Sequence, residues 1–238
     1  MNVMAGARAP VFERRFYLVV SAVFVALVFW TFARTYFLKT VYGTPALPLL
    51  LHVHGVVMSG WVVLLAVQSS LVAMRRVAWH RRIGWFGTAW AVLVVSMGSI
   101  TTVHAAARAV RTSSDAAPML VAIAGLEVMQ MIFFAAFVGA AVLLRRRTDY
   151  HKRLMLMTVV CMLPSVLSRL PVSFMSNAAI LIGLDLFIVI AVGIDTWRHR
   201  RLHPAFAWSG GLFLAAFNGG IFFFMSAAWI RFGTSLVS

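Results

Sequence analysis

The chain has 238 residues, of which 62% are hydrophobic and 11% are charged, and its formal net charge is +15. Soluble domains are typically about 45–50% apolar and about 25% charged, so this composition excludes a water-soluble fold and predicts an integral membrane protein. Such a positive charge would favour nucleic-acid binding in a soluble chain. Here the basic residues flank apolar segments instead, and we expect no nucleic-acid partner.

Seven segments with few or no charges are long enough to cross about 30 Å of hydrocarbon. Because the connections between them are short, they predict an all-α, seven-transmembrane-helix bundle that forms one domain over residues 1–238. The first segment is longer than the apolar region of a secretory signal and is expected to be an uncleaved anchor. The predicted spans cover approximately residues 16–37, 46–73, 83–106, 118–144, 152–175, 177–197 and 205–230.

The basic residues predict the orientation of this bundle. If the N-terminus is cytoplasmic, fifteen of the 21 Lys and Arg residues lie on the inner side and six on the outer side. Positive charge accumulates on the cytoplasmic side of membrane proteins, so the C-terminus is expected outside, in the periplasm. The expected location is the bacterial inner membrane, with anionic lipids as partners of the cytoplasmic face.

Ionisable side chains within the predicted spans are costly in hydrocarbon, so they are candidates for function. At 1.5 Å per residue, four different spans place such side chains roughly 9–14 Å below the outer surface. A further histidine ends the third span and is expected at the rim. These outer-layer candidates for cofactor binding are His52, His54, His104, Glu127, Arg169 and Asp185.

The two histidines of the motif LHVHG, at 51–55, point in different directions. Residues two apart on a helix are separated by about 200°, so His52 and His54 are poorly placed to bind one ion. His54 shares a stripe with Trp61 and Gln68 at spacings of seven, whereas His52 lies on a face with Gly55. We expect His54 to face the site, with Gln68 as polar support, and His52 to pack against another helix.

The fifth predicted span carries a polar stripe on one face. Such a stripe should face the bundle interior or a water-filled cavity. The alternative interpretation is interhelical hydrogen bonding with a buried ion pair between Arg169 and either Glu127 or Asp185. The stripe consists of His151, Thr158, Ser165 and Arg169.

A second group of histidines lies at the predicted cytoplasmic boundary, before the third, fifth and seventh spans. Three imidazoles and a carboxylate at one level are a donor set for zinc or iron. Histidines at a membrane boundary also bind lipid phosphates or cap helix ends, and that alternative stays open. These inner-layer metal candidates are His80, His151, His203 and Asp195.

Several motifs together carry a resemblance to a known group. They are LHVHG at 51–55, HRRIG at 80–84, HKRLM at 151–155 and LHP at 202–204, with Trp61, Gln68 and Arg169. The set resembles a family of bacterial multi-span membrane proteins of unknown function and covers most of the chain. Since that family is itself uncharacterised, the resemblance implies a shared architecture and no activity.

The histidines on several helices are also similar to those of cytochrome b561-type membrane cytochromes. In those proteins, facing helices supply paired histidines to two b hemes, one near each membrane surface. The similarity implies a pair formed by His80 and His151 on the inner side. On the outer side it implies that His54 pairs with the shallower His104.

The expected function is therefore membrane redox chemistry or electron transfer, with heme b or a non-heme iron or zinc ion as cofactor and quinone as partner. One alternative is a non-catalytic subunit or assembly factor of a respiratory or photosynthetic complex. Another is a seven-span zinc-dependent lipid hydrolase, similar to the progestin and adiponectin receptor group. The sequence has no Gly-rich phosphate loop and no HExxH motif, so it leaves open whether the protein is an enzyme.

Overall fold

The computed structural model describes residues 11–170 and 177–238, with side chains described for 15–170 and 181–238. The end of the fifth predicted span, residues 171–175, lies outside this part of the chain. All regular elements within it are helical. The helices are α1 (Val11–Phe32), extended by a π-helical turn (Ala33–Phe37), α2 (Leu49–Ala73), α3 (Val77–Arg111), α4 (Ala117–Leu143), α5 (Thr148–Leu167), α6 (Asn177–His199), α7 (Pro204–Phe224) and α8 (Ala227–Val237).

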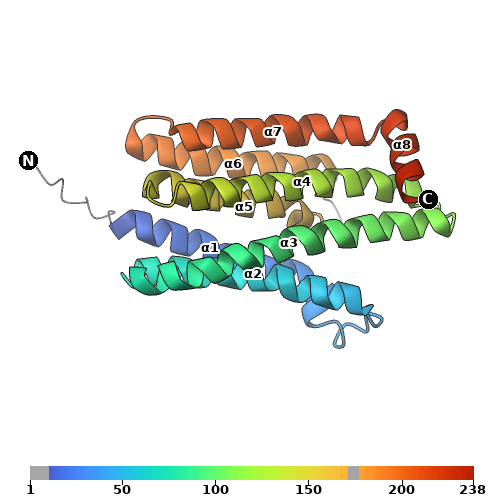
Figure 1. Ribbon diagram of the computed structural model, residues 1–238, viewed down its shortest axis with the longest axis horizontal. Coiled ribbons are helices and arrows are strands. Elements are labelled where there is room, and N and C mark those ends of the chain that lie inside the picture. Colours follow the sequence, from blue (N-terminus) through green and yellow to red (C-terminus); the bar gives the residue numbers. More distant parts are fainter. Residues whose placement is uncertain (1–10, 171–176) are drawn as a thin grey trace, which may run out of the picture.

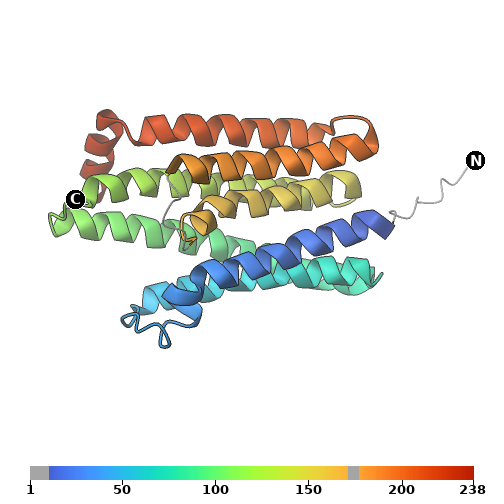
Figure 2. The ribbon, with the colours of Figure 1, turned by 180° about the vertical axis from the view of Figure 1, so that it is seen from behind.

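Helices α1 to α7 run lengthwise in one bundle, and α8 crosses its end (Figure 1). Helices α4 to α7 lie together on one side of the bundle, and α1 to α3 lie on the other. The view from behind shows α1 passing beside α5 (Figure 2), and α3 packs along α4, so both helix pairs join the two groups. The start of α1 and the C-terminal α8 lie at opposite ends of the bundle.

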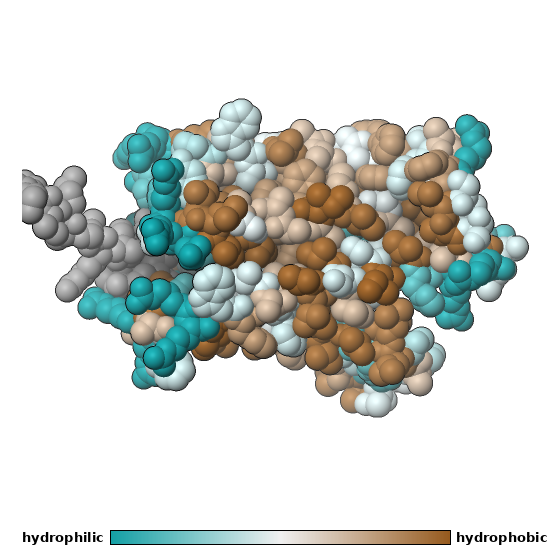
Figure 3. All heavy atoms as spheres, in the orientation of Figure 1, coloured by the Kyte–Doolittle hydropathy of each residue, from teal (hydrophilic) through white to brown (hydrophobic). Residues whose placement is uncertain are grey.

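Five of these helices are long and apolar enough to cross a membrane. Apolar residues dominate the middle of the visible surface, and hydrophilic residues gather toward its two ends (Figure 3). These are the features of a helical membrane protein, as the composition predicted. The five segments are Arg15–Phe37, Leu49–Ala73, Val77–Arg111, Ala117–Leu143 and Pro204–Phe224.

The last predicted span, 205–230, is divided in the structure. α7 ends at Phe224, and Ser226 begins a new helix by accepting a hydrogen bond at its side-chain oxygen from the backbone N–H of Trp229, at 3.2 Å. Serine favours this N-cap position because its side chain satisfies a donor that the first helical turn leaves free. The Trp229 indole donates to the carbonyl of Val121, at 3.4 Å, and this bond holds α8 across the end of α4.

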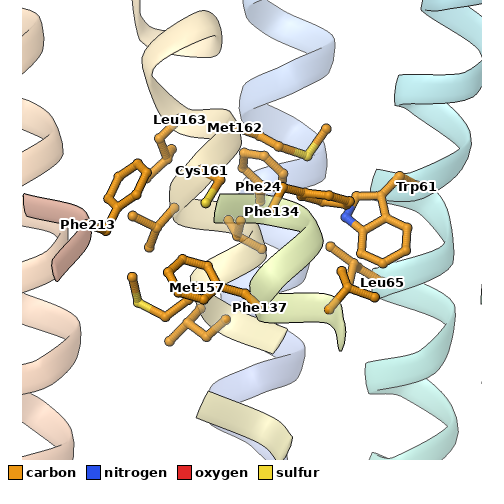
Figure 4. Packing of buried hydrophobic residues seen from close by; sticks show 14 of the residues in the cluster. Phe24, Trp61, Leu65, Phe134, Phe137, Met157, Cys161, Met162, Leu163 and Phe213 are labelled. Atoms are coloured by element: carbon orange, nitrogen blue, oxygen red, sulfur yellow. The ribbon is translucent and has the colours of Figure 1, made fainter. Parts of the chain in front are cut away.

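The largest apolar cluster lies in the middle of the bundle. Phe134 of α4 and Phe213 of α7 are completely buried, and Trp61 of α2 is 2% exposed. The Trp61 and Phe134 rings meet edge to face with their centres 5.0 Å apart, and Phe24 and Met162 lie around them (Figure 4). We call Phe24, Trp61, Phe134 and Met162 the aromatic layer, since three of the four side chains are aromatic. This part of the apolar cluster separates two groups of polar residues that are described below.

Candidate functional site

His80 and His151 face each other near the end of the bundle where α1 begins. Their ring centres are 6.1 Å apart, and the ring planes make an angle of 80°. The Nδ1 atom of His151 lies 2.8 Å from the carbonyl oxygen of Ala141 on α4. Because a carbonyl only accepts, Nδ1 carries the ring proton and Nε2 keeps its lone pair. His151 is thus oriented in the way that backbone carbonyls orient metal-ligating histidines.

The side chain of Gln68 on α2 holds His80 in place. With its amide nitrogen turned toward α3, Gln68 donates to Nδ1 of His80 at 2.5 Å and to the His80 carbonyl at 3.2 Å. In the same orientation its oxygen accepts from the backbone N–H of Gly84, at 3.0 Å. The reverse orientation would set the amide oxygen against the His80 carbonyl oxygen and the amide nitrogen against the Gly84 N–H, so Gln68 is the donor and Nδ1 of His80 the acceptor.

The other inner-layer candidates do not join His80 and His151. Both ring nitrogens of His203 are engaged: Nε2 lies 3.1 Å from Oδ2 of Asp149, and Nδ1 accepts from the backbone N–H of Ala205 at 3.1 Å. Asp195 pairs with an arginine instead. Within the described residues, no three or more His, Cys, Asp or Glu side chains gather closely enough to hold a metal ion.

Asp195 of α6 forms a buried ion pair with Arg153 of α5. The guanidinium binds both carboxylate oxygens, with Nε to Oδ2 at 2.9 Å and Nη2 to Oδ1 at 2.7 Å. Arg153 is only 1% exposed, and its Nη1 donates to the carbonyl of Asp149 at 2.8 Å. Sequence reasoning counted Arg153 only among the basic residues of the cytoplasmic side and missed this pair. The available signal was Asp195 itself, since a carboxylate at a membrane boundary needs a cationic partner.

The contact between His203 and Asp149 ties the start of α7 to the start of α5. Desolvation raises the pKa of Asp149. Three hydrogen bonds lower this pKa: one from His203 and two from the backbone N–H groups of Asp149 and Tyr150. Together with the charge of His203 they outweigh the effect of desolvation, so the pKa of Asp149 lies below its ordinary value of 3.8. A lowered carboxylate pKa means that the ionised form stabilises the fold.

This contact predicts an acid-sensitive part of the stability. The contribution of Asp149 is fully present above its unfolded-state pKa and is lost as the pH falls through its lower folded-state pKa. In Asp149→Asn, the thermal midpoint should be lower at neutral pH and should converge with that of the wild type in acid. Thermal unfolding in detergent across the acid range measures this difference in thermal midpoint.

Asp115→Asn, at an exposed residue between α3 and α4, is the control, and its thermal midpoint should follow that of the wild type at every pH. Parallel curves for Asp149→Asn would contradict the assignment.

A second polar cluster lies on the other side of the aromatic layer, toward the end where α8 crosses. His54 of α2 lies within electrostatic range of Glu127 on α4 and of Arg169, which follows the end of α5. Ser165 donates to Oε1 of Glu127 at 3.4 Å, and the Ser165 carbonyl accepts from Nη1 of Arg169 at 2.6 Å. The Arg169 guanidinium lies over the Phe32 ring, at 5.0 Å from its centre. The structure thus brings together three of the outer-layer candidates and Ser165 of the polar stripe.

The remaining outer-layer candidates lie elsewhere. Asp185 of α6 accepts a hydrogen bond from Asn218 of α7, at 3.3 Å. His104 is exposed on α3. His52 turns toward Tyr36, whose ring centre is 5.9 Å away and whose hydroxyl donates to the His52 carbonyl at 3.1 Å. Thr158, in the polar stripe, is completely buried and donates to the carbonyl of Met155 in its own helix, at 2.7 Å.

The heptad spacing of α2 is what separates the two polar clusters. His54 and Glu127 interact at one level. Seven residues further along each helix, Trp61 and Phe134 are in ring contact. Gln68 follows after another seven residues and contacts His80. One face of α2 therefore carries a polar, an aromatic and a second polar position in turn.

Comparisons of this chain with protein-family models, with curated proteins and with solved structures found no match. The functional argument therefore rests on the two clusters and on their chemistry.

Proposed function

We propose that this chain is a bacterial inner-membrane redox protein that holds heme b between His80 and His151. The observation that carries the proposal is the pair of imidazoles on α3 and α5, with ring centres 6.1 Å apart. With metal–nitrogen bonds of about 2.0–2.1 Å, two imidazoles on opposite sides of one metal ion have ring centres about 6 Å apart. The donor set and the separation therefore support binding of one metal ion by both histidines, which would hold the iron of the heme.

The number of protein ligands favours heme over a non-heme ion. Zinc and non-heme iron usually take three or four ligands from the protein, whereas heme brings four nitrogens and needs two axial ligands. When bound, heme b supplies a one-electron iron couple. The chain contributes the lone pair of Nε2 in His151, which the Ala141 carbonyl fixes. For His80, Nδ1 accepts from the Gln68 amide in the structure, so ligation through Nε2 would require the ring proton to move to Nδ1 and the amide to turn.

The proposed topology has seven spans, with the N-terminus in the cytoplasm. Support comes from α1 to α7, which run lengthwise, and from the arginines at the end where α1 begins. Positive residues favour the cytoplasmic side, where anionic lipids attract them. In this orientation His80 and His151 lie near the cytoplasmic boundary, and the cluster around His54 lies in the outer half.

An absorption spectrum with metal analysis on detergent-purified protein tests the proposal. We expect a Soret band, stoichiometric iron, and loss of both in His80→Ala and in His151→Ala. His104→Ala is the matched control, since it removes an exposed imidazole from the same helix as His80. A wild-type protein purified from heme-replete cells without heme absorbance or iron would refute the proposal, as would a His151→Ala variant that keeps both.

A further inference from the structure

A groove between α1 and α2 opens on the apolar surface of the bundle. Its volume is about 370 Å³, and it lies between Val25 of α1 and the stretch of α2 from Val63 to Met74. Among the described lining residues only Ser70 is polar, and its hydroxyl already donates to the carbonyl of Ala66, at 2.7 Å. Because its walls leave no polar group to pair, the groove suits hydrocarbon and not a polar ligand.

The groove has the length of one leaflet of a bilayer. At 1.5 Å per residue, α2 rises about 16 Å from Val63 to Met74. One leaflet contributes half of the hydrocarbon thickness, which is about 15 Å. Since α2 ends where α1 begins, the groove runs from the middle of the bundle to the end that the proposed topology places at the cytoplasmic surface (Figure 1). An acyl chain of the inner leaflet therefore matches its length.

Two arginines lie directly beyond the surface end of the groove. Arg75 and Arg76 follow Met74, and both are exposed. The backbone N–H of Arg75 donates to the carbonyl of Val72 at 3.1 Å, and that of Arg76 donates to the carbonyl of Leu71 at 2.8 Å. These bonds hold both arginines within about one turn of the groove. Within the described side chains neither arginine forms an ion pair, so both charges remain available to an anion.

We propose that the groove holds one acyl chain of an anionic phospholipid and that Arg75 and Arg76 bind its phosphate. The apolar walls account for the chain, and the two cations at the surface end account for the headgroup. Basic residues beside membrane helices on the cytoplasmic side attract anionic headgroups in this way. The proposal goes beyond a general attraction of basic residues to the membrane, because it assigns one lipid molecule to one groove. It does not depend on the heme proposal.

The charge of the headgroup provides the first test. Native mass spectrometry of the detergent-purified full chain, titrated with phosphatidylglycerol and with phosphatidylcholine of the same acyl chains, measures the binding of each lipid. One arginine near the surface strengthens the binding of an anionic lipid by about fivefold, so phosphatidylglycerol should bind at least about tenfold more tightly. Equal affinities of the two lipids would overturn the proposal.

Two pairs of arginines provide matched variants for the same titration. Arg75→Gln/Arg76→Gln should remove the preference for phosphatidylglycerol. Arg146→Gln/Arg147→Gln removes the same charge from an exposed pair at the same end of the bundle and should keep the preference. Equal losses in the two double variants would show a diffuse effect of surface charge and would overturn the proposal.

Two exposed valines of α2 test the groove itself. Val67 lines it, whereas Val56 lies three turns earlier on the same face of the helix and outside the groove. The two side chains are 40% and 59% exposed, so each position accepts a larger side chain without repacking of the core. Val67→Trp should fill the groove and weaken phosphatidylglycerol binding by about tenfold, and Val56→Trp should leave it unchanged. Full binding by Val67→Trp would overturn the proposal.

The same spectra distinguish a lipid from a second copy of the chain in the groove. A monomer that retains one phosphatidylglycerol molecule, and loses it in Val67→Trp, supports the proposal. A dimer that Val67→Trp converts to a monomer would show that a second copy covers the groove, and this result would overturn the proposal.

Discussion

Replacement of Arg153 by methionine is expected to destabilise the protein by about 3–5 kcal/mol, because it removes the guanidinium that binds both oxygens of the buried Asp195 carboxylate. Arg153 is 1% exposed and Asp195 is 8% exposed, so water replaces little of the lost interaction. The pair also joins α5 to α6, and Arg153 binds the backbone at the start of α5. Thermal or denaturant unfolding in detergent, followed by circular dichroism, measures the change.

Two further variants show that the loss comes from the ion pair. Arg146→Met removes an exposed arginine from the same basic run and should change the stability by less than about 1 kcal/mol. The double variant Arg153→Met/Asp195→Leu removes both charges and should recover much of the stability, because an apolar pair avoids the cost of desolvation. A double variant as unstable as Arg153→Met would show that the cost comes from packing and not from an unpaired charge.

A second large effect is expected for Phe134→Ala, with a loss of about 3–5 kcal/mol. Phe134 is completely buried in the aromatic layer, so its removal creates a cavity beside Trp61 (Figure 4). Phe222→Ala is the matched control, since Phe222 is 81% exposed on α7 and its truncation opens no cavity. Thermal midpoints of the two variants, measured in the same detergent, check the prediction. Equal midpoints would show that the layer around Phe134 is loosely packed.

The helices themselves could be predicted from the sequence, because long uncharged runs leave a chain in lipid no other way to pair its backbone. The break between α7 and α8 was harder to recognise, since Met225 and Ser226 interrupt the apolar run only briefly. The signal was Ser226, a favoured N-cap residue, followed by a segment whose inward face carries Trp229 and Gly233. Hydropathy averaged over a whole span does not register one polar residue of this kind.

Depth in the membrane could be predicted for the polar residues, but their neighbours around the bundle could not. Each residue advances a helix by 1.5 Å, so His54, Glu127 and Arg169 could be assigned to one level. Asp185 was assigned to the same level, yet it faces Asn218, because α6 packs against α5 and α7. The order of helices around a bundle depends on contacts between distant segments, which one sequence does not reveal.

Arg153 shows a further limit of reasoning from local sequence. It follows Lys152 and the arginine run at 145–147, so it resembles a topology-determining charge. The direction of its side chain distinguishes Arg153 from the other basic residues. Arg153 follows His151 by two residues on α5, so its side chain points to the opposite side of the helix, toward α6. Adjacent cationic residues can thus have different environments, and only the partner helix decides which of them binds a buried carboxylate.

The aromatic layer has a consequence for the energy stored across the membrane. A membrane that maintains a proton gradient must not contain a continuous file of water and titratable groups from one face to the other. Polar residues occur on both sides of Trp61 and Phe134, and of these two side chains only the buried indole N–H of Trp61 could hydrogen-bond to water. Ionisable groups can therefore lie on both sides of this layer while apolar rings interrupt the path between them.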